Sequence, residues 1–253
     1  MAAISAVIIT RNEARHIVKC LDSLEDVVDE VVVVDSGSTD ETIALCTARG
    51  ARVYSKDWTG YAAAKNYGND QAQGPYILSI DADESLSPEL RTLLFVHKSQ
   101  LTDVYGFARR NLYRGRWLRG GGWYPDVKVR LFPKGGCRWV GDYVHEKLQI
   151  DPGLSTRILP GDLLHDTIDS ISDHIARINH YSDLRAQEWY KLGKRPSWAR
   201  QLLRPAWRFL RMYLLQGGVR EGWEGFWLCR ISAMGSFLEH AKLREHYRRQ
   251  GGA

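Results

Sequence analysis

The stretch Tyr76-Ile77-Leu78-Ser79-Ile80-Asp81-Ala82-Asp83-Glu84 is a short, mostly apolar run that ends in three carboxylates. An apolar run of this length predicts a buried strand, which would deliver Asp81 and Asp83 to its carboxyl end. That end is where open α/β sheets bind ligands. Alternate residues leaving a strand can direct carboxylate oxygens at one divalent cation, whose open positions then take phosphate oxygens. In the alternative interpretation these acids bind no ligand, and the stretch is only a strand end followed by a capped helix with Pro88 in its first turn.

The composition is typical of a globular protein with an anionic partner. The chain has 253 residues, 44% of them hydrophobic and 26% charged, so it can bury a substantial core. Its net charge is +5, and the arginines are crowded into the second half. Such a charge suits a phosphorylated sugar, an anionic lipid or nucleic acid. Because no nucleic-acid-binding motif is present, we do not expect nucleic acid as a partner.

The cysteines and the apolar runs indicate the compartment. Cys20, Cys46, Cys137 and Cys229 lack the spacing of a zinc site or a thioredoxin motif. Free thiols, together with an amino terminus that does not resemble a secretion signal, predict a reducing cytosol. No uncharged apolar run reaches the roughly 18 residues that a membrane span needs. We therefore expect a cytoplasmic protein that does not cross the membrane.

Strands and helices alternate along the first hundred residues. Ile4 to Thr10 has the β-branched, apolar pattern of a central strand, and Val31 to Val34 repeats it. Ser38 and Glu41 have the spacing of a capping box for the helix that follows. A further strand is predicted at 51–54, and helices are predicted up to residue 24 and at 41–49, 62–72 and 88–98. This alternation predicts an α/β fold, a mostly parallel sheet with helices on both faces.

The first strand-to-helix turn, Thr10-Arg11-Asn12-Glu13-Ala14, contains no glycine. Without glycine the backbone cannot approach a pyrophosphate closely, which excludes a dinucleotide-binding Rossmann site there. What remains is a pair of acids, Asp35 and Asp81, at the ends of neighbouring strands. These carboxylates are suited to hydrogen-bonding a base and a ribose.

The second half of the chain contains two single residues that are candidates for catalysis or metal binding. Strands are predicted at 105–111, 128–132 and 158–164, with a glycine-rich loop at 113–125. Glu146 lies in an otherwise apolar and basic stretch, where partial burial would suit it to accept a proton. The residues alone favour a surface glutamate paired with Lys147. His165 closes the last of these strands, and a lone histidine is more often structural than a ligand.

The chain changes character after Ile168. Isoleucines recur at helical spacing from Ile171, and we expect His174 and His180 on this helix to be solvated. Three arginines, Arg204, Arg208 and Arg211, fall on one side of a later helix that Pro205 is predicted to start, with Trp207 and leucines on the other. This helix either packs on the rest of the protein or lies at an anionic membrane surface.

Four motifs in order over residues 4 to 86 resemble the nucleotide half of family-2 glycosyltransferases with the GT-A fold: VIITRNEA, VVVVDSGSTDET, AAAKNYG and ILSIDADE. Farther on, Gly-Asp-x-x-His-Glu follows an Arg-Leu-Phe strand. This arrangement is similar to bacterial transferases that extend the lipopolysaccharide inner core, of the β-1,4-glucosyltransferase type. The resemblance implies a Rossmann-like GT-A domain followed by a helical carboxyl-terminal extension.

The resemblance also assigns roles to residues. It implies that the nucleotide pocket is lined by Thr10, Asn12 and Glu13, that the uridine is held by Asp35 and Asp81, and that the base or diphosphate lies near Lys65. It implies that Asp83 binds a divalent metal, Mg²⁺ or Mn²⁺, which bridges the diphosphate. His165 is a candidate second metal ligand, with Asp166 behind it. Glu146 takes the position of the catalytic base, and Asp142 is the competing candidate.

These inferences predict a catalytic domain at 1–167, with a nucleotide-sugar half at 1–100 and an acceptor half at 101–167, and a helical region at 168–253. The predicted activity is inverting, metal-dependent transfer of a sugar, glucose by the resemblance, from a UDP-sugar to a lipid-linked inner-core saccharide, with heptose as acceptor. The enzyme would attach peripherally to the inner face of the cell membrane. Two alternatives remain: transfer to polyprenyl phosphate, an acceptor already anionic, and a catalytically silent module that binds anionic lipid.

Overall fold

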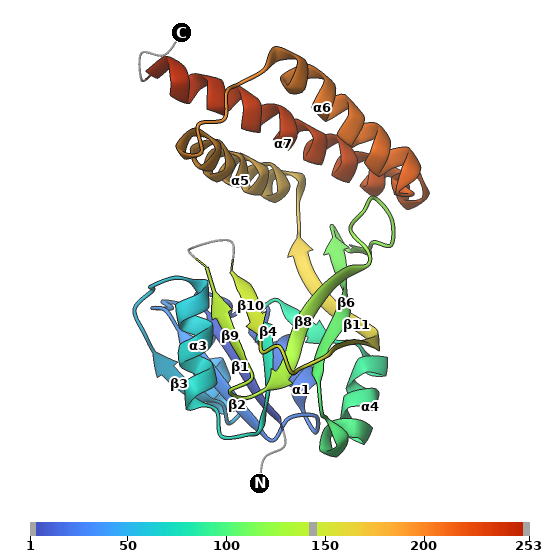
Figure 1. Cartoon of the computed structure of the whole chain (residues 1–253). Coiled ribbons are helices and arrows are strands. Elements are labelled where there is room, and N and C mark those ends of the chain that lie inside the picture. Colours follow the sequence, from blue (N-terminus) through green and yellow to red (C-terminus); the bar gives the residue numbers. More distant parts are fainter. Residues whose placement is uncertain (1–3, 142–145, 250–253) are drawn as a thin grey trace. The chain divides into compact units, whose positions relative to one another are not determined.

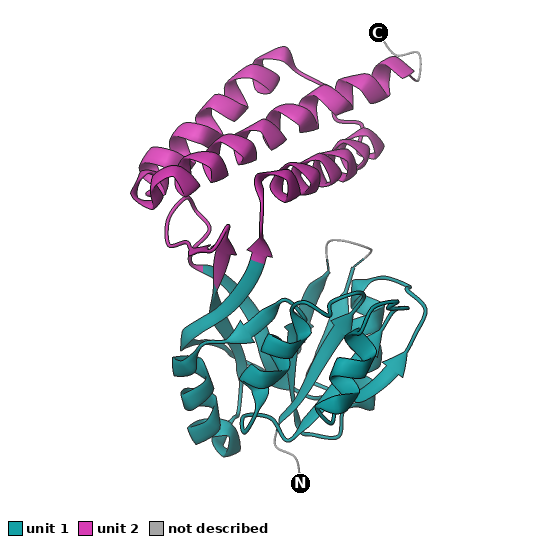
Figure 2. Cartoon of the chain, turned by 180° about the vertical axis from the view of Figure 1, so that it is seen from behind, with its two compact units in different colours: residues 1–109, 126–166 teal, residues 110–125, 167–253 magenta. Residues whose placement is uncertain are grey.

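The computed structural model describes residues 4–141 and 146–249. The chain forms two compact units, which Figure 2 distinguishes by colour. Residues 1–109 and 126–166 form the first, here called the sheet unit, and residues 110–125 and 167–253 form the second, the helical unit. Two long strands, β6 (Val104–Tyr113) and β11 (Thr156–Ile168), contribute residues to both units.

The main sheet has the strand order β3-β2-β1-β4-β8-β6-β11-β5, and β7 (Arg116–Trp117) pairs with β6. Its parallel part consists of β1 (Ile4–Thr10), β2 (Glu30–Asp35), β3 (Arg52–Ser55) and β4 (Tyr76–Asp81). The strands β8 (Asp126–Pro133) and β5 (Glu84–Leu86) join it through antiparallel pairs: β8 with β4 and β6, and β5 with β11. The α/β fold predicted from the sequence is confirmed. The sheet is mixed, however, because no crossover helix separates β6 from β8, and such strands pair antiparallel.

Helices cover both faces of the sheet, as predicted (Figure 1). One face packs against α1 (Ile17–Leu24), α2 (Thr42–Ala48) and α4 (Pro88–His97), which is followed by the short η1 (Lys98–Gln100). The other face packs against α3 (Tyr61–Gln71) and the hairpin of β9 (Cys137–Val140) and β10 (Lys147–Ile150). Side chains alternate between the two cores, as the strand period of two requires: Ile8 belongs to the first and Val7 to the second.

Local sequence explains where two of these helices begin. The side chain of Ser87 accepts a hydrogen bond from the backbone of Leu90, and Pro88 occupies the first turn of α4, as predicted. The capping box predicted for Ser38 and Glu41 is wrong, because α2 has no side-chain cap. The Ser38 hydroxyl instead donates to Asp35, which competes for it at the end of β2.

The helical unit is built from α5 (Ile171–Lys191), α6 (Trp198–Leu210) and α7 (Gly222–Arg249), with the π-helical turn η2 (Arg211–Leu215) and the 3₁₀ turn η3 (Gly218–Glu221) before α7. The long helix α7 packs against both α5 and α6 (Figure 1). Pro205 lies inside α6 and does not start it; the start is capped by Ser197. No helix in the described part of the chain is both long and apolar enough to cross a membrane.

His174 is buried, so the prediction that it is solvated is wrong, whereas His180 is exposed. The segment 110–125 belongs to the helical unit, and the hydroxyl of Tyr113, the last residue of β6, lies 3.0 Å from Nδ1 of His174. Burial lowers the pKa of His174 to about 4; Asp173 opposes this and Arg177 adds to it. The pattern of α5 alone could not show this burial, because the covering residues are about 60 positions earlier in the sequence.

Candidate functional site

The carboxyl ends of β1, β2 and β4 bring the predicted acids together. In the strand register Thr10 lies opposite Asp35, and Ile9 lies opposite Asp81. Asp35 and Asp81 therefore flank the end of the central strand β1, one on each side. The sequence argument from strand ends placed these residues correctly relative to one another.

Asp35 is fully buried and accepts four hydrogen bonds from the protein. Its donors are the hydroxyl of Thr10 at 3.0 Å, the backbone N–H groups of Gly37 at 3.0 Å and Ser38 at 2.8 Å, and the Ser38 hydroxyl. Two carboxylate oxygens offer about four acceptor positions, so these bonds use most of the capacity of Asp35. Its geometry is that of a residue which orders the turn after β2. Its contact with uridine stays a prediction.

The loop after β1 is held to the loop after β2 by Asn12 and Glu13. Asn12 has a φ of 57°, in the left-handed region that asparagine tolerates better than most residues. Its side-chain oxygen accepts from the backbone N–H of Thr39 at 2.8 Å. The backbone N–H of Glu13 donates to the Thr42 hydroxyl at 2.8 Å, and its carboxylate lies 3.0 Å from His16. Hydrogen bonds thus hold Thr10, Asn12 and Glu13 to the segment that follows β2. Their contact with a nucleotide stays a prediction.

Asp81 lies between two cations. One carboxylate oxygen is 3.0 Å from the ammonium of Lys65, and the other pairs with the guanidinium of Arg130. Burial by itself raises the pKa of Asp81, but Arg130 and Lys65 together hold it well below its usual range. Lys65 is buried, and its ammonium also lies 4.6 Å from the ring centre of Trp139. Asp81 is therefore an anion fixed in place by the protein.

Arg130 connects Asp81 to a further chain of ion pairs that sequence reasoning missed. Its guanidinium lies 2.7 Å from the buried carboxylate of Glu84, which also pairs with Arg109 at 3.2 Å. Arg109 in turn pairs with Asp126 at 2.7 Å. The signal in the sequence was an arginine inside the apolar run of β8, because an arginine buried in a strand needs an acidic partner.

The predicted base, Glu146, belongs to the same cluster. One of its carboxylate oxygens lies 3.4 Å from the ammonium of Lys65, so Lys65 bridges Glu146 and Asp81. The Glu146 side chain is 22% exposed, which leaves it accessible to a substrate. The competing candidate, Asp142, lies outside the described residues, as does His145.

The two predicted metal ligands lie side by side. Nε2 of His165 is 3.1 Å from a carboxylate oxygen of Asp83. The pairing of β11 with β5 sets this contact, since it places His165 opposite Glu84, the residue after Asp83. The backbone of Asp83 also accepts from the N–H of Asp166, whose carboxylate lies 3.9 Å from Lys19.

A divalent cation fits the Asp83–His165 pair by the chemistry of its donors. A carboxylate oxygen and an imidazole nitrogen already converge, and both side chains are partly accessible. Residues 4–141 and 146–249 contain no group of three or more His, Cys, Asp or Glu side chains placed to hold a metal. Asp83 and His165 thus offer two donors, and their binding of a metal stays a prediction.

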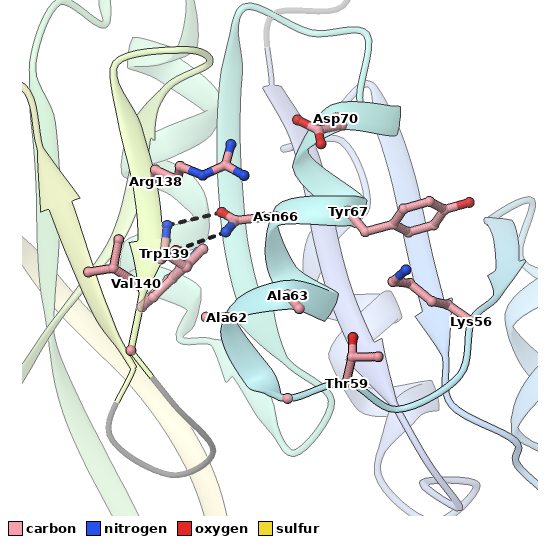
Figure 3. Close-up of a pocket in the computed structure, with 12 residues that line it drawn as sticks. Lys56, Thr59, Ala62, Ala63, Asn66, Tyr67, Asp70, Arg138, Trp139 and Val140 are labelled. Atoms are coloured by element: carbon pink, nitrogen blue, oxygen red, sulfur yellow. Dashed lines mark hydrogen bonds between the residues drawn. The ribbon is translucent and has the colours of Figure 1, made fainter.

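A separate cavity of about 530 Å³ lies between α3 and β9 (Figure 3). The side chain of Asn66 joins its two walls, accepting from the backbone N–H of Trp139 at 3.0 Å and donating to the carbonyl of the same residue at 2.8 Å. Lys56 and Tyr67 line the opposite side. Neither Asp81 nor Asp83 lines this cavity, so it is distinct from the cluster formed by Lys65, Asp81 and Glu146. The two sites share the helix α3, which carries Lys65.

Solved structures resemble parts of this chain. The structure of residues 1–349 of S. aureus TarS aligns over 98% of this chain and 91% of its own, at 14% identity and a TM-score of 0.46. Glucosyl-3-phosphoglycerate synthase from Mycobacterium tuberculosis, solved with Mn²⁺, UDP and glucosyl-3-phosphoglycerate, aligns over 44% of each chain at 30% identity and a TM-score of 0.35.

Sequence relatives match nearly the whole chain. The lipopolysaccharide core biosynthesis glycosyltransferase LpsC of Rhizobium meliloti is 33% identical over 96% of this chain and 93% of its own length. An uncharacterized glycosyltransferase of Rickettsia bellii is 32% identical over 96% of this chain and 86% of its own. The profile of Glycosyl transferase family 2 matches residues 5–135, the segment that carries the acids at the strand ends. The chain belongs to glycosyl transferase family 2 and is a glycosyltransferase enzyme.

Proposed function

We propose that this glycosyltransferase moves glucose from UDP-glucose to a heptose of a lipid-linked lipopolysaccharide inner core, with inversion and with a divalent metal. The observation that carries the proposal is the placement of Asp83 and His165 beside the cluster of Lys65, Asp81 and Glu146. Asp83 and His165 would hold the metal near the end of β4, and Glu146, which Lys65 links to Asp81, would be the base. The likeness to LpsC supports the choice of acceptor class.

Departure of UDP requires neutralisation of the charge that develops on its diphosphate. Asp83 and His165 would hold Mg²⁺ or Mn²⁺, which when bound supplies electrostatic stabilisation to the diphosphate oxygens. Asp35, Asp81, Thr10, Asn12 and Glu13 would bind and orient the nucleoside. Lys65 keeps Asp81 and Glu146 as neighbours despite their like charges, since its ammonium contacts both.

Inversion requires a base on the side of the anomeric carbon opposite to the leaving group. In the proposed reaction the acceptor hydroxyl attacks that carbon, the bond to the diphosphate breaks, and Glu146 takes the hydroxyl proton. A sugar hydroxyl is too weak an acid to ionise at neutral pH, so a positioned carboxylate is needed. Transfer to polyprenyl phosphate would not need this base.

The test is a transfer assay with several UDP-sugars, Mg²⁺ or Mn²⁺, and two rival acceptors, a heptose-terminated lipid A-core and polyprenyl phosphate. We expect a heptose-linked product that forms only with metal. Asp83→Asn should abolish transfer and metal-assisted UDP binding in calorimetry while the circular dichroism stays unchanged. Asp22→Asn is the matched control, because the exposed side chain of Asp22 pairs with Arg49 at the surface, away from Asp83. Full activity in excess EDTA would refute the metal role, and a product on polyprenyl phosphate alone would refute the acceptor.

We also propose that the enzyme attaches peripherally to the inner face of the membrane through α6. Apolar side chains are exposed along this helix and η2: Trp198, Leu202, Leu203, Trp207, Leu210, Leu214 and Leu215. An amphipathic helix with exposed tryptophan and leucine suits the interface of a bilayer. The arginines expected beside them, Arg204, Arg208 and Arg211, are exposed. Arg208 also donates to Ser236 on α7, and Arg204 lies over the Trp189 ring on α5.

A further inference from the structure

The helical unit contains a strongly basic cavity of about 410 Å³. Its walls come from α5, the turn after it, α6 and α7. The cations that line it are Arg185, Lys194, Arg195, Arg200, Arg204 and Arg208. A single acid, Glu239, lines it with them. The cavity therefore concentrates far more positive charge than the protein around it neutralises.

Three of these cations, Arg200, Arg204 and Arg208, lie on α6. Arg200, Arg204 and Arg208 recur every four residues and so lie on one stripe of the helix. Within the described part of the chain, none of the three forms an ion pair with a carboxylate. Arg204 instead lies 5.5 Å from the ring centre of Trp189. Burial lowers the pKa of Arg208; Glu239 opposes this, and Arg204 and Arg211 lower it further.

His240 gives a second and independent indication of a ligand. It lines the same cavity and is only 3% exposed, yet neither ring nitrogen has a hydrogen-bond partner among the described residues. Buried polar groups in folded proteins are almost always paired. Burial lowers the pKa of His240, and the charges of Arg204, Arg200 and Arg244 lower it further. These effects favour the neutral imidazole, which has one N–H group to donate.

We propose that this cavity binds a phosphate monoester. A phosphate dianion would supply the charged acceptors that Arg200, Arg204 and Arg208 lack among the described residues, and arginine forks match its oxygens in pairs. Its oxygens would also accept the unused N–H of His240. The cavity is larger than a phosphate ion, which leaves room for the group that carries the ester. The site lies wholly in the helical unit, so the proposal does not depend on the proposed transfer reaction.

The phosphate could belong to a soluble sugar phosphate or to a lipid headgroup. Arg200 and Arg204 also border an apolar groove that includes Leu203 and Trp207, on the adjacent stripe of α6. A lipid with a phosphate monoester headgroup would place its phosphate among the arginines and its chain along that groove. Both sources share the same recognition chemistry, and the probes below separate them.

The first test uses the full-length protein at low salt with glycerol 3-phosphate, followed by calorimetry and by the shift in melting temperature. We expect saturable binding that weakens by at least about tenfold in the double variant Arg204→Ala/Arg208→Ala, because charge-assisted hydrogen bonds are lost. Arg230→Ala, an exposed arginine of α7 outside the cavity, is the matched charge control and should bind normally. Absence of saturable binding, or equal weakening by Arg230→Ala, would overturn the proposal.

The second test uses His240→Leu, which removes the unpaired imidazole and keeps an apolar side chain beside Trp189. Without ligand its melting temperature should equal or exceed that of the wild type, while the stabilisation by glycerol 3-phosphate should be lost. An undiminished ligand shift would refute the role of His240.

Vesicles of phosphatidic acid and of phosphatidylglycerol then identify the source of the phosphate. Preference for phosphatidic acid, reversed by glycerol 3-phosphate, identifies a lipid headgroup. Binding of the soluble ester alone identifies a sugar phosphate or similar metabolite.

Discussion

The two units of the molecule treat clustered charge in opposite ways. In the sheet unit four acids, Asp81, Glu84, Asp126 and Glu146, are matched by the cations Lys65, Arg109, Lys128 and Arg130. In the helical unit six cations surround a cavity that a single acid lines. A cluster neutralised by the protein is preformed and can orient a substrate. A cluster of mostly exposed cations that the protein leaves unneutralised is open to an anionic ligand.

The largest effect on activity is expected from substitution of Glu146, a partly exposed member of the ion-pair cluster in the sheet unit. Glu146→Gln keeps the shape of the side chain and removes the base. Transfer should fall by about 10² to 10⁴ through turnover, while UDP and metal bind normally, because general base catalysis typically contributes that factor. Steady-state kinetics and UDP calorimetry measure the two quantities. If Asp142→Asn is inactive while Glu146→Gln retains near-normal turnover, Asp142 is the base.

Breaking the matched cluster at its centre should cost stability. Arg130→Met leaves Asp81 and Glu84 without their shared guanidinium, and removing one member of a buried ion pair costs about 3–5 kcal/mol. Urea unfolding measures the change in the free energy of unfolding. Arg138→Met on β9 is the control: this arginine is exposed, and such surface substitutions usually stay within about 0.5 kcal/mol. Equal stability of the two variants would mean that the network contributes nothing.

The difference between the units also limits what the sequence could predict. Strand periodicity predicted that Asp35 and Asp81 lie together, because strand ends meet at one edge of a sheet. The family resemblance paired Asp83 with His165, and the two side chains lie side by side. Periodicity says nothing about which strand lies next to which acid. Arg130 was therefore missed, since its pairing with Asp81 depends on the antiparallel contact of β8 with β4.

In the helical unit the sequence predicted helices but not their surroundings. Spacing put Arg204, Arg208 and Arg211 on one side of a single helix. The structure places Arg204 and Arg208 on a common stripe of α6, whereas Arg211 begins η2. Which side faces α5 and α7 depends on contacts between helices distant in sequence, and so does the burial of His174 and His240. Pro205 was read as a helix start because proline is frequent there, whereas Ser197 caps the helix two turns earlier.

The pH dependence of stability should also differ between the two units, which is a smaller effect. His174 has an unfolded pKa near 6.5 and a folded pKa of about 4, so between these values the unfolded state binds a proton that the folded state does not. The helical unit should therefore lose stability as the pH falls from about 6.5 to 4, by on the order of 1 kcal/mol per pH unit. Asp81, whose folded pKa is lowered, contributes stability above about pH 4, and this is lost only at lower pH.

Urea unfolding between pH 4 and 7, followed by probes in each unit, measures this separation. His174→Gln should flatten the pH dependence of the helical unit. His180→Gln should leave it unchanged, because His180 is exposed on the same helix. Identical slopes for the wild type and His174→Gln would contradict the assignment.

The smallest effect concerns the apolar stripe of α6, which lies beside the unneutralised cavity. Trp207 is 59% exposed, and at a membrane only part of its ring would leave water. Trp207→Ser should therefore weaken co-sedimentation with anionic vesicles by about fivefold, or about 1 kcal/mol, less than the full burial of a large apolar side chain contributes. Trp58→Ser is the matched control, because Trp58 is an exposed tryptophan of the sheet unit.

Salt should weaken vesicle binding of the wild type if surface arginines take part, by on the order of 1 kcal/mol for each. Arg204→Ala/Arg208→Ala separates the two contributions: it should remove much of the salt dependence and leave the effect of Trp207→Ser in place. Equal binding by both tryptophan variants would mean that the exposed stripe of α6 serves another contact.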